Sequence, residues 1–127
     1  MRLLLDTHVF IWAVMDDPRL NQRARAIIEE ASGVYVSAAS IWEIAIKSRL
    51  GKLDADPEDM VRAIDSSGFI ELPVSSLHAA RVVKLPLNDR HKDPFDRLLV
   101  AQSMVEPLVL LSADPKLSSY GGLVQQI

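Results

Sequence analysis

The chain has 127 residues, a length that suits one domain, and its 49% hydrophobic content is enough to bury a core. Its net charge of −3 excludes a simple basic nucleic-acid-binding protein, although acids gathered in one site could still be neutralised by a metal ion. The absence of cysteine excludes disulfides, thiolate catalysis and cysteine-based zinc sites.

Short apolar segments alternate along the chain with segments of helical periodicity. In chain order we expect a strand over residues 2–5, a helix over 8–15, a helix from Leu20 to Ala31, a strand over 34–36, helices over 38–50 and 57–66, a strand over 69–72, helices over 76–84 and 94–105, and strands over 108–111 and 123–126. This alternation predicts a single α/β domain, residues 1–127, with a mostly parallel sheet of four to five strands.

The apolar segments are short. None approaches the roughly 20 residues of a membrane span, and no signal peptide is visible. We therefore expect a soluble, cytoplasmic protein that has no membrane partner.

Two of the predicted strands are each followed by an aspartate at the same edge of the sheet. Asp6 follows the strand over residues 2–5, and Asp114 follows the strand over 108–111. In open parallel sheets the binding site lies outside the carboxyl ends of the strands. Asp6 can cap the next helix, but a carboxylate at the end of a buried strand also loses hydration unless it is paired or bound to a metal.

The pair Asp93 and Asp96 has two interpretations. Asp-Pro occurs four times in the chain, and aspartate followed by proline is a common helix start. Asp96 would then favour the helix dipole by about 0.3–1 kcal/mol with no further role. The alternative is that Asp93 and Asp96 help to hold a metal ion. The nearly identical sequence that begins at Asp56 has no candidate catalytic residues near it, so it serves as an internal control for a helix start without chemistry.

Glu43 also has competing interpretations. It can close a capping box with Ser40, or pair with Lys47 one turn later for about 0.2–0.5 kcal/mol. It can also join Asp6, Asp96 and Asp114, because a parallel sheet brings these positions to one edge. Clustered carboxylates repel one another, so such a site calls for a cation, and hard oxygen ligands favour Mg²⁺ or Mn²⁺.

The basic residues near Asp93 form the run Arg90-His91-Lys92, and Arg97 follows Asp96. Such a run is typical of a solvated loop, but next to an acidic metal site Arg90, Lys92 and Arg97 could hold a phosphate backbone. The histidines have no metal-ligand spacing, and His78 is expected on a helix surface.

Four segments of the chain resemble PIN domains, and more closely the VapC-type toxins of toxin–antitoxin pairs in the subgroup that carries Asp-Pro-Phe-Asp-Arg. The segments are LLLDTHVFIWA, VSAASIWEIAIKSRLGK, HKDPFDRLLVAQS and LLSADPKLSSYG. The resemblance implies a three-layer α/β/α sandwich and a Mg²⁺- or Mn²⁺-dependent endoribonuclease. It also implies an RNA substrate, a homodimer and a cognate antitoxin that blocks the site.

The same resemblance assigns residues. It implies that Asp6, Glu43 and Asp96 are catalytic metal ligands, that Asp114 is the last acid of the set, and that Ser112 is a hydroxyl residue often found two positions before it. Asp93 belongs to the subgroup string and is a further candidate. Two alternatives stay open: a PIN-like module that binds RNA or protein without cutting, and a receiver-like signalling domain.

Overall fold

The computed structural model describes residues 1–86 and 93–127. Within these residues it has a five-stranded sheet of order β3-β2-β1-β4-β5 in which every neighbouring pair is parallel. The strands are β1 (Arg2–Leu5), β2 (Gly33–Ser37), β3 (Ile70–Leu72), β4 (Val109–Ser112) and β5 (Val124–Gln126). The predicted α/β class with a parallel sheet is therefore confirmed.

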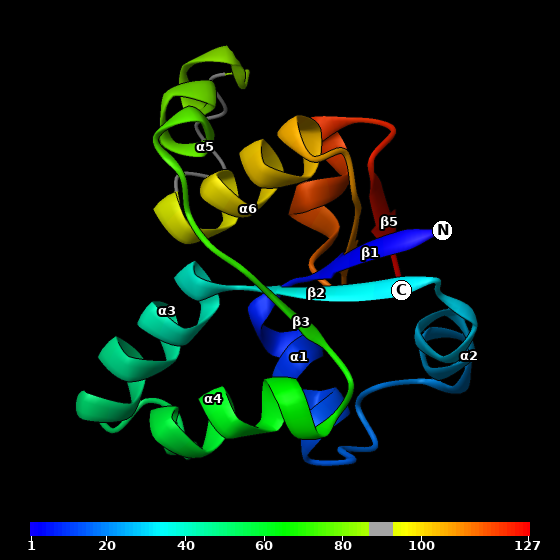
Figure 1. Ribbon diagram of the computed structural model, residues 1–127, viewed down its shortest axis with the longest axis vertical. Coiled ribbons are helices and arrows are strands. Elements are labelled where there is room, and N and C mark those ends of the chain that lie inside the picture. The colour runs from blue at the N-terminus through cyan, green and yellow to red at the C-terminus, as the bar shows by residue number, and fades with distance from the viewer. Residues whose placement is uncertain (87–92) are drawn as a thin grey trace.

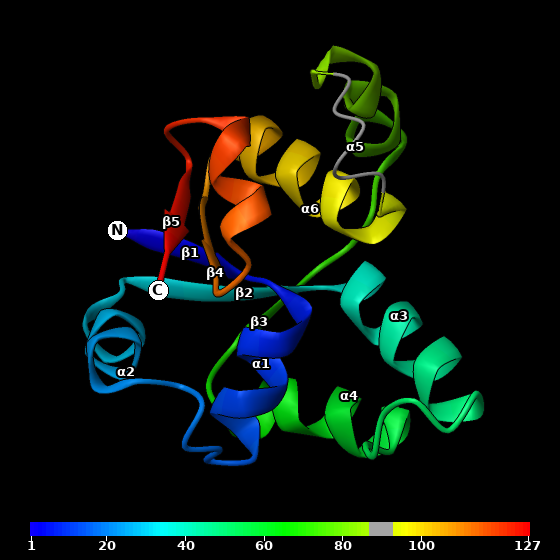
Figure 2. The ribbon, with the colours of Figure 1, turned by 180° about the vertical axis from the view of Figure 1, so that it is seen from behind.

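Helices cover both faces of the sheet, as Figures 1 and 2 show. The helices are α1 (Thr7–Val14), α2 (Gln22–Glu30), α3 (Ala38–Arg49), α4 (Pro57–Ser66), α5 (Ser76–Arg81) and α6 (Pro94–Val105), with the 3₁₀ segments η1 (Val82–Lys84) and η2 (Pro115–Tyr120). One face carries α1 to α4, and the other carries α5 and α6 (Figure 1). This is the three-layer sandwich that was expected.

The leucines of β1 explain why both faces need a helical layer. Leu3 and Leu5 pack into the core on the face of α1 to α4, whereas Leu4 packs into the core on the face of α6. Successive side chains of a strand point to opposite faces, so a strand that is apolar at every position must be covered twice. All three leucines are fully buried.

The strand order reverses at β1. The chain runs from β1 outward to β2 and β3, and later returns to place β4 on the other side of β1. In parallel sheets such a reversal opens a crevice at the carboxyl ends of the two central strands. β1 ends at Leu5 and β4 ends at Ser112, so Asp6 and Asp114 both follow strands at this point.

Two local expectations need correction. The single helix expected over residues 76–84 is divided into α5 and η1, because the chain tightens into a 3₁₀ turn before Pro86. The turn η2 after Asp114 was not expected. None of the helices that the structure describes is both long and apolar enough to span a membrane.

Candidate functional site

Asp6 lies at the end of β1 and begins α1. Its backbone N–H donates to Leu111 O at 3.1 Å, which ties it to β4, and its Oδ1 accepts a hydrogen bond from Val9 N at 2.9 Å. Its Oδ2 accepts a hydrogen bond from Ser112 Oγ at 2.5 Å. The side chain is buried, and this burial raises the pKa of Asp6 although the two hydrogen bonds act in the opposite direction. Asp6 is therefore a helix cap and also a buried carboxylate at the strand-order reversal.

Glu43 lies in the middle of α3 and is buried. Its Oε1 accepts a hydrogen bond from Thr7 Oγ1 at 2.7 Å, and its Oε2 lies 2.6 Å from Lys47 Nζ. The capping-box interpretation is wrong, because α3 begins at Ala38 with Ser37 as its cap, which places Ser40 inside the helix. The pairing with Lys47 is confirmed. The sequence indicated an exposed ion pair, but the Glu43 side chain is buried.

The start of α6 carries Asp93 and Asp96. Asp93 caps the helix, because its Oδ1 accepts hydrogen bonds from Phe95 N at 2.8 Å and from Asp96 N at 3.2 Å. Burial raises the pKa of Asp96 from 3.8 to about 7, and further causes are the charges of four other acids. These acids are Asp93, Glu43, Asp6 and Asp114. We call the five residues Asp6, Glu43, Asp93, Asp96 and Asp114 the acidic cluster.

Ser112 links Asp6 to Asp114. Its hydroxyl donates to Asp6 and accepts a hydrogen bond from Asp114 N at 3.0 Å. Asp114 then caps η2 by accepting a hydrogen bond from Lys116 N at 2.9 Å. The hydroxyl residue that the motif comparison singled out is thus in direct contact with two members of the acidic cluster.

The basic residues that were predicted to bind phosphate do not form one group among the described residues. Arg90 and Lys92 lie outside the described residues. The Arg97 guanidinium donates to Pro86 O and to Tyr120 Oη, each at 3.0 Å, so it joins the start of α6 to the end of η2. His78 was expected on the surface, but it is buried, and its Nε2 lies 2.5 Å from a carboxylate oxygen of Glu106.

Sequence reasoning missed Thr7 and gave Lys47 only a surface role. Thr7 is buried directly after Asp6, and its hydroxyl lies between Glu43 and Ser40, 3.0 Å from Ser40 Oγ. The sequence offered one signal for Thr7, namely a hydroxyl residue directly after an acid at the end of a strand. Only the packing of α1 against α3 shows that Thr7 contacts the second acid.

The donor set of the acidic cluster fits a hard divalent cation, because its members are carboxylates that raise the pKa of one of their number. Among residues 1–86 and 93–127, however, no group of three or more carboxylate or imidazole side chains is close enough together to hold one ion as placed. Lys47 Nζ stands against Glu43 instead.

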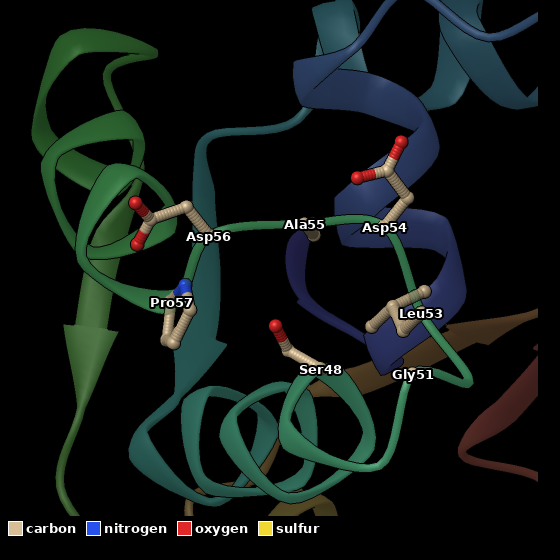
Figure 3. Close-up of a pocket in the computed structure, with 7 residues that line it drawn as sticks. All are labelled: Ser48, Gly51, Leu53, Asp54, Ala55, Asp56 and Pro57. Atoms are coloured by element: carbon tan, nitrogen blue, oxygen red, sulfur yellow. The ribbon is translucent and has the colours of Figure 1, made fainter.

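A separate pocket of about 490 Å³ lies where α3 ends and α4 begins (Figure 3). It is lined by Ser48, Gly51, Leu53, Asp54, Ala55, Asp56 and Pro57. Asp56 caps α4 by accepting a hydrogen bond from Glu58 N at 2.9 Å, and no member of the acidic cluster lines the pocket. The control Asp-Pro string therefore lies apart from the candidate site.

Comparison with known proteins agrees with this fold. Residues 3–123 match the model of the PIN domain family. No curated protein matches the sequence. A chain of the VapBC2 complex from Rickettsia felis, bound to a DNA fragment from the promoter, aligns with a TM-score of 0.67 and 13% identity over 99% of this chain and 98% of that one. A chain of DNA-bound VapBC from Salmonella typhimurium aligns with a TM-score of 0.68 and 15% identity, over 99% of this chain and 98% of that one. A chain of a toxin–antitoxin complex from Klebsiella pneumoniae aligns with a TM-score of 0.63 and 21% identity, over 98% of this chain and 99% of that one. Since the family model covers nearly the whole chain, this protein belongs to the PIN domain family.

Proposed function

We propose that this protein is a Mg²⁺- or Mn²⁺-dependent endoribonuclease and the toxin of a cytoplasmic toxin–antitoxin pair. The observation that carries the proposal is the convergence of the five acids on one site: burial raises the pKa of Asp96 to about 7, and the charges of the four other members of the acidic cluster raise it further. Carboxylates that destabilise one another's charge are typical of a site that works with a bound cation. Membership of the PIN domain family supports nuclease chemistry at this position.

Each residue of the site has a proposed role. Asp6, Glu43 and Asp96 hold the ion directly or through water, and Asp114 completes the set, with Asp93 as cap and further acid. Ser112 orients Asp6 and Thr7 orients Glu43 through the hydrogen bonds described above. When bound, the divalent cation supplies Lewis-acid chemistry for the attack of water on a phosphodiester.

The toxin assignment is supported by the complexes to which the chain is similar in fold. Those compared above are two VapBC complexes and one complex named as a toxin–antitoxin complex. We therefore propose a cognate antitoxin and a homodimer as partners. A small antitoxin gene directly upstream, whose product copurifies with this protein, would support the pairing.

The family match removes the receiver-like alternative. The remaining alternative is a PIN module that binds RNA or protein without cutting. A cleavage assay on structured and unstructured RNA, with Mg²⁺, with Mn²⁺ and with a chelator, separates the two. We expect metal-dependent cleavage by the wild type, loss of cleavage without loss of folding in Asp6→Asn, and unchanged cleavage in the control Asp56→Asn. Full activity of a folded Asp6→Asn protein would refute the proposed site.

A further inference from the structure

Both carboxylate oxygens of Glu43 have partners within the chain. Thr7 Oγ1 donates to Oε1, and Lys47 Nζ donates to Oε2 at 2.6 Å. The Glu43 side chain is 4% exposed, so water contributes little to its solvation. Burial of a carboxylate costs free energy unless a cation and hydrogen bonds compensate its charge. Lys47 provides the cation.

Lys47 is placed differently from an ordinary surface lysine. Its side chain is 34% exposed, so the ammonium group lies at the border between the buried Glu43 and solvent. The charges of Asp93 and Asp96 act on it in addition to that of Glu43. The ammonium group therefore contacts an acid of α3 and is influenced by the charges of two acids at the start of α6, a helix that packs against α3.

The other described cations near the acidic cluster do not take this position. Arg97 donates to Pro86 and Tyr120. His8 acts electrostatically on Asp6, but it is exposed on α1 and its ring contacts Trp12. Within residues 1–86 and 93–127, the ion pair that reaches the cluster is the one formed by Lys47.

We propose that Lys47 is the resident counter-ion of the acidic cluster, which holds Glu43 in the metal-free protein and must leave Glu43 Oε2 before a divalent cation can use that oxygen. The inference rests on the metal-dependent function proposed above and adds a regulator of the same site. Lys47 acts through Glu43, so it is a positioning residue. By opposing the entry of a second cation, it sets the metal affinity below the value that the carboxylates alone would give.

The first arm of the test uses the metal-free protein. Lys47→Met leaves the buried Glu43 carboxylate unpaired, so the melting temperature in EDTA should fall by about 5 °C. Adding Glu43→Gln to this variant should restore most of the loss, because the amide carries no charge. The control is Arg62→Met, which removes a cation from an exposed pair with Asp59 on α4 and should shift the melt by less than about 2 °C.

The second arm measures Mn²⁺ binding by calorimetry. We expect Lys47→Met to bind Mn²⁺ about tenfold more tightly than the wild type, equivalent to about 1.4 kcal/mol. Lys47→Arg keeps the charge and should retain the wild-type affinity to within about threefold. Arg62→Met should bind as the wild type does, since its charge lies outside the site.

The outcomes separate this inference from the proposed function. Equal or weaker Mn²⁺ binding by Lys47→Met overturns the competition between Lys47 and the ion while leaving the nuclease in place. Binding by Lys47→Met but not by the wild type supports the competition. If no variant binds Mn²⁺, the metal-dependent function and the competition both fail, and the metal-free melts alone decide whether Lys47 is the counter-ion. Equal melts for Lys47→Met and Arg62→Met overturn that role.

Discussion

Asp96→Asn should change how the stability of the metal-free protein depends on pH. The pKa of Asp96 is raised from 3.8 to about 7, so the folded protein holds this proton more tightly than the unfolded chain does. Ionisation of Asp96 therefore opposes folding. Its effect is absent below pH 3.8, grows as the pH rises, and is complete above about pH 7. Asparagine carries no charge and removes the effect throughout this window.

The size of the effect follows from the same values. At about 1.4 kcal/mol per pKa unit, the difference between 3.8 and about 7 corresponds to about 4 kcal/mol in the free energy of unfolding. Of this change in the free energy of unfolding, about 2.5 kcal/mol develops between pH 5 and pH 8. Because Asp96 is only half-buried, solvent screening reduces that part to about 1–2 kcal/mol. A charge in the first turn of α6 also favours the helix by about 0.3–1 kcal/mol, which opposes the effect.

The assay is denaturant unfolding in EDTA at pH 5, 6, 7 and 8. The difference in unfolding free energy between Asp96→Asn and the wild type should grow with pH in favour of the variant. The matched control is Asp59→Asn, since Asp59 occupies the same helical position after Asp56-Pro57 but is exposed and paired with Arg62. Its curve should run parallel to that of the wild type. A parallel curve for Asp96→Asn as well would refute the reasoning.

Three further predictions concern the same site. Ser112→Ala removes a hydrogen bond that lowers the pKa of Asp6, so the acidic limb of the cleavage rate against pH should move to higher pH; an unmoved limb would show that Ser112 does not tune Asp6. Asp93→Asn and Asp56→Asn should both keep the fold, since asparagine caps as well as aspartate, and only Asp93→Asn should slow cleavage. Mg²⁺ at a hundredfold excess over Kd should stabilise the wild type by about 2.7 kcal/mol in thermal melts, and Glu43→Gln should weaken this response; an equal response would place the ion elsewhere.

Much of the fold could be predicted from the sequence because its signals are local. The apolar run before Asp6 predicts β1, and Asp93-Pro94 predicts the start of α6, since strand burial and helix capping depend on residues close in the chain. The parallel order of alternating strands and helices then predicts which edge of the sheet carries the acids. Local patterns were less reliable where a helix end could be satisfied in two ways, as at Glu43, where Ser37 took the capping role assigned to Ser40.

The sequence by itself thus predicted most of the elements and the parallel sheet, and it indicated which acids are candidates for the site, because these predictions follow from periodicity and from motifs that each lie within a few residues. Only the tertiary structure decided which acids interact. Asp56 and Asp93 begin nearly identical strings, yet Asp56 lies beside a separate pocket, whereas Asp93 acts on Asp96. The burial of Glu43 against Thr7, and the effect of Asp93 and Asp96 on Lys47, depend on helix packing between residues distant in the chain. Such contacts leave no local pattern to read.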